Sequence, residues 1–174
     1  QAEYSKGKCY LVHLPTGDIF RSTIKNDTEL GRLAKTFMDK GDLVPDEVTI
    51  KMLQSEVDKN PEAKGFLFDG FPRTIAQAEA LDAFLNSKEQ EITATIALEA
   101  DDEILVTRLL ERGKTSGRAD DQDEEKIRNR YQEYNEKTAP LMDYYKEQNK
   151  FYPVNGIGSI EEITERLSQV IEKL

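Results

Sequence analysis

Four short apolar segments alternate with amphipathic segments along the chain, and this alternation constrains the fold more than any other feature. The apolar segments are bounded by turn residues and cover residues 10–14, 65–69, 92–98 and 151–155. Such segments are typical of buried strands in a parallel sheet. Because parallel strands are joined by right-handed crossovers through helices, the alternation predicts an α/β fold whose parallel sheet is flanked by helices.

Local signals mark the ends of the helices between these strands. Thr74 is suited to open a helix and Gly113 to end one, while Ser159 and Glu162 have the spacing of a capping box. The predicted helices cover residues 47–58, 75–86 and 102–112 and the segment that follows Ser159. The buried face of the second helix is predicted to carry Ile75, Ala78, Leu81 and Leu85.

The composition narrows the classes of partner. With 174 residues the chain is expected to form a single domain, and its net charge of −10 disfavours binding to nucleic acid or an acidic membrane. No apolar run approaches the ~20 residues of a membrane span, so we expect the cytoplasm as its compartment. A single cysteine, Cys9, excludes an internal disulfide framework and a cysteine-based zinc site, and its expected role is core filling. Local clusters of arginine can still hold a small anionic ligand.

The segment 69–74 (DGFPRT) directly follows an apolar strand and is the most specific motif. In open α/β sheets, ligands bind beyond the carboxyl ends of the strands. Asp69 therefore stands where a carboxylate can order the water shell of a divalent ion, and Arg73 where a guanidinium can clamp a phosphate. Gly70 and Pro72 shape the turn. A plain strand-to-helix turn is the structural alternative, and the context favours a ligand site.

The segment 16–21 (TGDIFR) also follows an apolar strand. Thr16 is suited to cap the helix that follows, and Arg21 lies one turn further along. Alone this is a common helix start, but together with the segment 69–74 it predicts a second phosphate clamp. His13, the only histidine, lies in the preceding strand and is expected in the core rather than in catalysis.

The segment 112–121 contains two glycines, a Thr-Ser pair and alternating charges, which predict a mobile loop. Arg112 at the end of a helix also fits the helix dipole, and Arg118 beside Asp120 and Asp121 also fits solvated surface charge. Arginines on a flexible loop favour a lid that closes over phosphates and excludes water.

The helix around Arg130 distinguishes two neighbouring arginines. Arg128 has Glu124 four residues before it, an ordinary exposed ion pair. Arg130 has Lys126 at that position, so a pocket anion is a better explanation for Arg130 than for Arg128. The buried face of this helix is predicted to carry Ile127, Tyr131, Tyr134 and Leu141.

Five of the nine arginines fall in these four segments. Arginine rather than lysine suits the planar, bidentate recognition of phosphate. An acidic chain that concentrates its arginines in this way is most simply an enzyme that acts on phosphate esters. The five are Arg21, Arg73, Arg112, Arg118 and Arg130.

In these motifs the chain resembles the adenylate kinases over essentially its whole length. The segments TGDIFR, LVPDE, DGFPRT, LLERGKTSGRADD, IRNRY and VNGIGS occur in the family's order and approximate spacing. The resemblance implies reversible phosphoryl transfer from MgATP to AMP, which gives two ADP. It also implies a P-loop nucleoside monophosphate kinase fold, with a small helical AMP-binding insert over 15–44 and a short lid over 111–121.

By motif position, the resemblance assigns residues to each nucleotide. Arg112 and the backbone at Gly158 would contact ATP, while Arg118 and Arg130 would hold phosphates between the two nucleotides. Asp69 would organise the hydration shell of Mg²⁺. The expected catalytic set is Asp69, Arg73, Arg112, Arg118 and Arg130. The AMP pocket would contain Thr16, Arg21, Asp42, Leu43, Val44, Gly70, Phe71, Pro72, Arg73, Gln77, Arg118 and Arg130.

The resemblance also sets the expected cofactors and partners. ATP, AMP and ADP would be the small-molecule partners and Mg²⁺ the cofactor, with ATP as phosphoryl donor. The short lid resembles that of members without zinc, so no structural zinc is expected. We expect a monomer.

Two departures from the family pattern are present. Pro15 stands where members usually have serine. Residues 1–8 (QAEYSKGK) resemble the end of a helix, whereas a parallel sheet needs a preceding strand–helix unit. We therefore expect the complete protein to carry, upstream of Gln1, a first strand and the glycine-rich phosphate loop with its lysine. In the family that strand lies between the strands at 65–69 and 92–98.

Three alternatives differ in substrate or in class. A UMP/CMP kinase shares the fold, but that branch tends to have Asn and Ala where this chain has Thr74 and Thr16, so adenine is favoured. A non-catalytic nucleotide-binding scaffold would leave the presence of Asp69 and the five arginines unexplained. An acidic interaction domain without a ligand would leave the placement of the arginines to chance.

Overall fold

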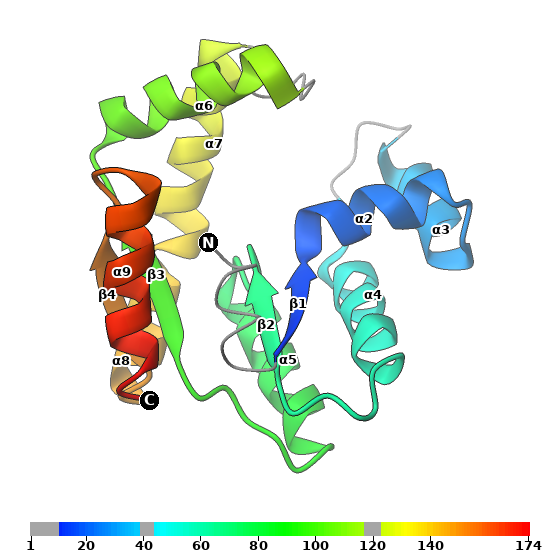
Figure 1. Ribbon diagram of the computed structural model, residues 1–174. Helices are drawn as coiled ribbons and strands as arrows, with labels where there is room; N and C mark the ends of the chain where they lie inside the picture. Colours follow the sequence, from blue (N-terminus) through cyan, green and yellow to red (C-terminus); the bar gives the residue numbers. More distant parts are fainter. Residues whose placement is uncertain (1–10, 39–43, 117–122) are drawn as a thin grey trace. The chain divides into compact units, whose positions relative to one another are not determined.

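The computed structural model describes residues 11–38, 44–116 and 123–174, apart from the side chains of Lys126 and Arg130. The chain divides into two compact units, Gln1–Glu91 and Ile92–Leu174 (Figure 1). Cys9, residues 1–8 and residues 117–122 of the expected lid lie outside the described residues. Whether the chain is a single domain, as expected, stays a prediction.

The first unit is built on two parallel strands. Val12 pairs with Phe66 and Pro15 with Asp69, so the carboxyl ends of both strands meet at one edge. Three helices connect the strands, and a fourth follows the second strand. The elements are β1 (Val12–Pro15), α2 (Thr16–Lys25), α3 (Glu29–Met38), α4 (Asp46–Asp58), β2 (Phe66–Asp69) and α5 (Ile75–Asn86).

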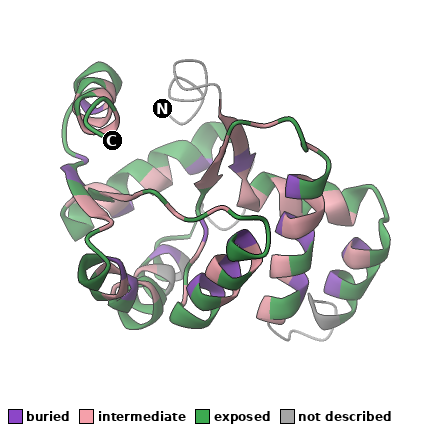
Figure 2. Ribbon diagram, turned by 90° about the horizontal axis from the view of Figure 1, so that it is seen from below, coloured by how far each residue is buried: buried purple, intermediate pink, exposed green. Residues whose placement is uncertain are grey.

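The three connecting helices of this unit share a small apolar core. Ala34 of α3 and Val48 and Met52 of α4 are buried in it. Figure 2 colours the buried residues of the chain purple. Burying a side chain the size of valine or methionine contributes about 1.5–3 kcal/mol. The partly buried side chains packed around them are Phe20, Ile24, Leu30 and Val44.

The second unit repeats the parallel arrangement. Thr95 pairs with Phe151 and Glu99 with Asn155, which again places the two carboxyl ends side by side. Its elements are β3 (Thr95–Glu99), α6 (Asp102–Ser116), α7 (Glu124–Glu133), the π-helical turn η2 (Tyr134–Thr138), α8 (Pro140–Glu147), β4 (Phe151–Asn155) and α9 (Ile160–Ile171).

The π-helical turn η2 has a local cause. Pro140 begins α8 and has no backbone N–H to donate to an earlier carbonyl. The preceding N–H, from Ala139, instead reaches back five residues to the carbonyl oxygen of Tyr134 at 2.9 Å. This wider turn holds one residue more than an α-helical turn, and the helical path continues through it from α7 into α8.

The predicted α/β class with parallel strands flanked by helices is confirmed. Within the described residues, however, the strands form two separate two-stranded sheets, β1–β2 and β3–β4. The expectation of fully buried strands is wrong, since only Leu14 and Val154 are buried among the strand residues. In a two-stranded sheet each strand keeps one unpaired edge, which leaves the other residues partly accessible.

Three details of the predicted helices are wrong. Helix α6 does not end at Gly113 but continues to Ser116, because Gly113 stays helical and buried. Ile75, at the start of α5, and Tyr134, in the π-helical turn, are both 39% exposed rather than part of a buried face. No helix in the described ranges combines the length and the apolar character needed to cross a membrane.

Candidate functional site

Asp69 ends β2 at the edge where the two strands of the first unit finish. Its side chain is 54% exposed, and its Oδ2 lies 3.1 Å from Nε2 of His13 on the neighbouring strand. His13 lies in a strand as predicted and is largely buried, but its ring is turned to this carboxylate. The carboxylate predicted from the sequence therefore stands at the carboxyl ends of the strands, accessible from one side.

The turn from β2 to α5 brings Gly70 and Arg73 together. Nε of Arg73 donates to the carbonyl oxygen of Gly70 at 2.9 Å. Gly70 has a φ of +75°, a conformation that favours glycine, and Phe71 beside it is buried. The carbonyl group of Gly70 thus holds the guanidinium of Arg73 against the turn that directly follows Asp69.

Thr74 and Gln77 fix the first turn of α5. The hydroxyl of Thr74 accepts from the backbone N–H of Gln77 at 3.2 Å, which confirms the predicted cap. Gln77 is buried, with 8% of its surface exposed, and its Oε1 accepts from the backbone N–H of Arg73 at 2.8 Å. Its Nε2 donates to Oδ1 of Asp46, the first residue of α4, at 2.6 Å.

Thr16 does not cap a helix, contrary to the prediction. Helix α2 begins at Thr16 itself, and Pro15 occupies the cap position without a side-chain hydrogen bond. The Oγ1 atom of Thr16 is buried and has no hydrogen-bond partner among the described residues. A buried hydroxyl without a partner costs free energy, so this atom is suited to receive a ligand group at the strand edge.

Arg21 and Val44 occupy two further predicted positions. Arg21 lies on α2, 55% exposed, and forms an ion pair with Asp18 three residues before it. Val44 is partly buried against the core of α3 and α4. Asp42 and Leu43, predicted beside Val44 in the same pocket, lie outside the described residues.

In the second unit, Gly158 lies between β4 and α9 in a conformation that requires glycine. Its φ is +126°, and a Cβ atom there would lie 2.5 Å from Oε2 of Glu162. Glu162 and Ser159 form the predicted capping box: Ser159 N donates to Glu162 Oε2 at 2.7 Å, and Glu162 N donates to Ser159 Oγ at 3.2 Å. The backbone at Gly158 is therefore held tightly at the start of α9.

Two arginines that the sequence did not single out hold the same turn. Arg108 of α6 donates to the carbonyl oxygens of Gly156 and Gly158, at 2.6 and 3.1 Å. Arg166 of α9 donates to those of Asn155 and Ile157, at 2.8 and 2.6 Å. The sequence does contain one signal that points to Arg108, because it lies four residues before Arg112 and therefore on the same face of α6.

The structure describes two of the remaining arginines from the sequence analysis, Arg112 and Arg128, including their side chains. Arg112 is an exposed residue of α6 near the end of the helix. Arg128 confirms the predicted ion pair with Glu124, at 2.8 Å, and also pairs with Glu103 at 3.1 Å. The hydrogen bonds that Arg128 donates to Glu103 and, to a smaller extent, to Glu124 raise its pKa. Arg118 and the side chain of Arg130 lie outside the described residues, so their contacts stay predictions.

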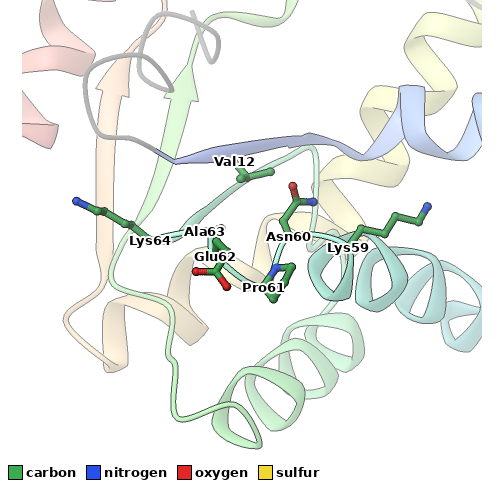
Figure 3. A pocket seen from close by; sticks show the side chains of 7 residues that line it. All are labelled: Val12, Lys59, Asn60, Pro61, Glu62, Ala63 and Lys64. Carbon is green, nitrogen blue, oxygen red and sulfur yellow. The ribbon is translucent and has the colours of Figure 1, made fainter.

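The first unit also contains a cavity of about 500 Å³ that none of its predicted site residues lines (Figure 3). It is lined by Val12, at the start of β1, and by the segment 59–64 that leads into β2. These are the amino ends of the strands, whereas Asp69 and the turn after it stand at the carboxyl ends. Because ligands in open α/β sheets bind at the carboxyl ends, this cavity is not the candidate site.

The donor groups at the strand edge fit Mg²⁺ better than a structural metal. No cluster of three or more His, Cys, Asp or Glu side chains able to hold a metal occurs in the part of the chain that the structure describes. Mg²⁺ typically keeps several waters and binds through one or two carboxylates together with substrate phosphates. A single exposed carboxylate at the end of a strand, Asp69, matches that mode of binding.

Comparison with known proteins agrees with these motifs. The profile of the family described as "Adenylate kinase" matches residues 1–150. Proteins named adenylate kinase from Flavobacterium psychrophilum and Flavobacterium johnsoniae are 79% and 71% identical over all 174 residues, which cover 92% of each relative's length. One from Bacteroides fragilis is 45% identical over the same span. The chain belongs to the adenylate kinase family.

Proposed function

We propose that the chain catalyses the transfer of a phosphoryl group from ATP to AMP, which gives two ADP. The observation that carries this proposal is the turn from β2 to α5. It gathers an exposed carboxylate, Asp69, and an arginine, Arg73, at the carboxyl end of a parallel strand. Because the chain belongs to the adenylate kinase family, we infer that the ligands of this turn are adenine nucleotides.

Most residues of the proposed AMP pocket belong to the first unit, and Arg118 and Arg130 belong to the second. The buried, unpartnered hydroxyl of Thr16 supports a ligand contact at the strand edge. Arg21 and Arg73 suit the phosphate because a guanidinium forms charge-assisted hydrogen bonds with it. The other residues of the pocket are Asp42, Leu43, Val44, Gly70, Phe71, Pro72, Gln77, Arg118 and Arg130.

ATP is assigned to residues of the second unit. Arg112 and the backbone at Gly158 would contact ATP. The hydrogen bonds that hold the turn around Gly158 support this role, because a preorganised backbone loses less conformational freedom on binding a ligand. Arg118 and Arg130 are proposed to neutralise the phosphates that lie between the two nucleotides.

Mg²⁺ is the proposed cofactor, held through water by Asp69. When bound, the ion would neutralise charge on the phosphate oxygens. The carboxylate of Asp69 would orient the ion's water ligands, and His13 on the neighbouring strand contacts that carboxylate at 3.1 Å. No structural zinc is proposed.

The chain's own residues would act by positioning and by charge. Phosphoryl transfer proceeds in line through a loose transition state and asks little covalent work of the protein. The arginines bind and orient the two phosphate chains so that the acceptor oxygen faces the transferred group. A lid over residues 111–121 would exclude water, which competes with AMP as acceptor.

The setting proposed for this activity is a cytoplasmic monomer. Its partners would be ATP, AMP and ADP, and neither nucleic acid nor a membrane. The net charge of −10 supports the absence of nucleic acid and membrane partners, because a strongly acidic chain is repelled by nucleic acid and by acidic lipid.

A comparison of acceptors tests the proposal. ADP formation from MgATP is measured by a coupled assay with AMP, CMP or UMP as acceptor, using the full-length protein. AMP is expected to be the preferred acceptor by a wide margin. Preference for CMP or UMP would instead assign the chain to pyrimidine nucleotides, and background ADP formation with AMP still bound would indicate a non-catalytic scaffold.

A further inference from the structure

Gln77 is a buried polar residue whose side-chain amide is held from both sides. Its Nε2 donates to Oδ1 of Asp46 at 2.6 Å, and its Oε1 accepts from the backbone N–H of Arg73 at 2.8 Å. Asp46 belongs to α4 and Arg73 to the turn before α5, so two separate segments of the first unit clamp one amide.

The chemistry of the two partners fixes which way the amide points. A carboxylate such as Asp46 can only accept a hydrogen bond, and a backbone N–H such as that of Arg73 can only donate one. A half-turn of the Gln77 amide would place oxygen against the carboxylate and NH₂ against the N–H. Both hydrogen bonds would be lost and two like dipoles would face one another, so a single orientation is stable.

The fixed amide still offers one donor and one acceptor to a ligand. A primary amide carries two N–H groups and two lone pairs, and these contacts use one of each. The edge of adenine presents a ring nitrogen that accepts and an amino group that donates, and a fixed amide matches that order. A 6-oxopurine presents a ring N–H and a carbonyl oxygen, which is the reverse order and would need the flipped amide.

We propose that Asp46 determines specificity in the acceptor pocket by holding the amide of Gln77 in the orientation that selects a 6-aminopurine over a 6-oxopurine monophosphate. The inference rests on the proposed function, which places Gln77 in the AMP pocket. Asp46 acts through Gln77 and is therefore a positioning residue.

Glu47, the neighbour of Asp46, provides a control that separates the positioning of Gln77 from a general effect of negative charge at the start of α4. Asp46 and Glu47 are both acidic residues in the first turn of α4, where negative charge favours the helix dipole. The hydrogen bond to Gln77 comes from Asp46, while Glu47 is exposed. Glu47→Gln therefore removes the same charge from the same turn and leaves the amide of Gln77 in place.

The test compares AMP with IMP, two acceptors that differ only at this edge of the base. The ratio of kcat/KM for AMP to that for IMP, with MgATP as donor, is measured for the wild-type protein, Asp46→Asn and Glu47→Gln. Calorimetric binding of both monophosphates gives a second readout. Asp46→Asn is expected to lower the preference for AMP by about tenfold, the size expected for one charge-assisted hydrogen bond. Glu47→Gln is expected to leave it unchanged.

A purely structural role for Asp46 gives a different result. Both acceptors would then lose activity together, with the AMP to IMP ratio unchanged in Asp46→Asn, and the proposal would be overturned. Asp46→Ser, which also removes the carboxylate, serves as the second variant where thermal unfolding shows that Asp46→Asn has not folded.

Gln77→Met separates failure of this inference from failure of the proposed pocket. If Gln77→Met loses the preference for AMP while Asp46→Asn and Asp46→Ser keep it, the pocket stands and the role of Asp46 is refuted. If Gln77→Met keeps the full preference, the base does not lie against Gln77, and both the pocket assignment and the inference fail.

Discussion

Arg108 and Arg166 donate to alternate carbonyl oxygens of one turn. Arg166 binds the carbonyls of Asn155 and Ile157, and Arg108 binds those of Gly156 and Gly158. Four successive carbonyl groups are thus held by guanidinium groups from two different helices. Loss of either arginine is expected to loosen the backbone that is proposed to contact ATP.

Arg166→Ala is expected to raise the KM for ATP by about three- to tenfold, since each hydrogen bond from a charged group contributes about 1.5 kcal/mol or more. The KM for AMP should stay the same, because Arg166 belongs to the second unit and has no proposed contact with AMP. Steady-state kinetics with each nucleotide varied in turn measures both values. Lys173→Ala, an exposed cation that follows the same helix, is the control. Equal changes in both KM values would contradict the role of the turn.

Arg73→Ala is expected to lower turnover by about a hundredfold or more, because it removes charge-assisted hydrogen bonds to phosphate. The fold should persist, since the substitution removes no buried apolar volume. Arg32→Ala is the control: Arg32 is an exposed arginine of α3 that pairs with Asp27 and lies in no predicted motif. Normal turnover per folded molecule in Arg73→Ala, measured beside circular dichroism, would refute its proposed role.

Arg130→Ala is expected to impair catalysis far more than Arg128→Ala. Arg128 is satisfied by Glu103 and Glu124, and such exposed ion pairs contribute little to stability because water screens them. Arg130 is proposed to face phosphate instead. Parallel measurement of kcat and of thermal unfolding distinguishes the two residues, and equal losses of kcat would show that the distinction between them is mistaken.

Gly158→Ala is expected to lower the free energy of unfolding by about 2 kcal/mol, from backbone strain at positive φ and loss of part of the capping box. The added Cβ would lie 2.5 Å from Oε2 of Glu162, so that carboxylate must leave the cap. Urea denaturation measures the change. Gly17→Ala is the control, since a Cβ there would lie 3.4 Å from the end of the Arg21 side chain, an ordinary contact. Unchanged stability in Gly158→Ala would contradict the geometry of the turn.

Local signals in the sequence predicted the elements and several caps. The alternation of segments gave the four strands within a few residues, and Thr74, Ser159 and the Arg128–Glu124 pair behave as predicted. These features depend on residues three or four positions apart, so the spacing along the chain is sufficient to predict them.

Other features depend on geometry that spacing does not determine. Thr16 fails as a cap because the helix already begins at that residue, with Pro15 before it. Gly113 ends no helix because it does not adopt a positive φ, which Gly70 and Gly158 do. The contacts of Gln77 with Asp46 join residues 31 positions apart, and those of Arg108 and Gly158 join residues 50 apart. Only the folded chain brings such residues together.

The measurement that tests the central claim most directly is the mass balance of the reaction followed by ³¹P NMR. The full-length protein is incubated with ATP and AMP, with Mg²⁺ or with the metal removed by a chelator. Loss of one ATP and one AMP for every two ADP formed, only when Mg²⁺ is present, is the predicted result. Release of inorganic phosphate from ATP without consumption of AMP, or no change in any nucleotide, would contradict it.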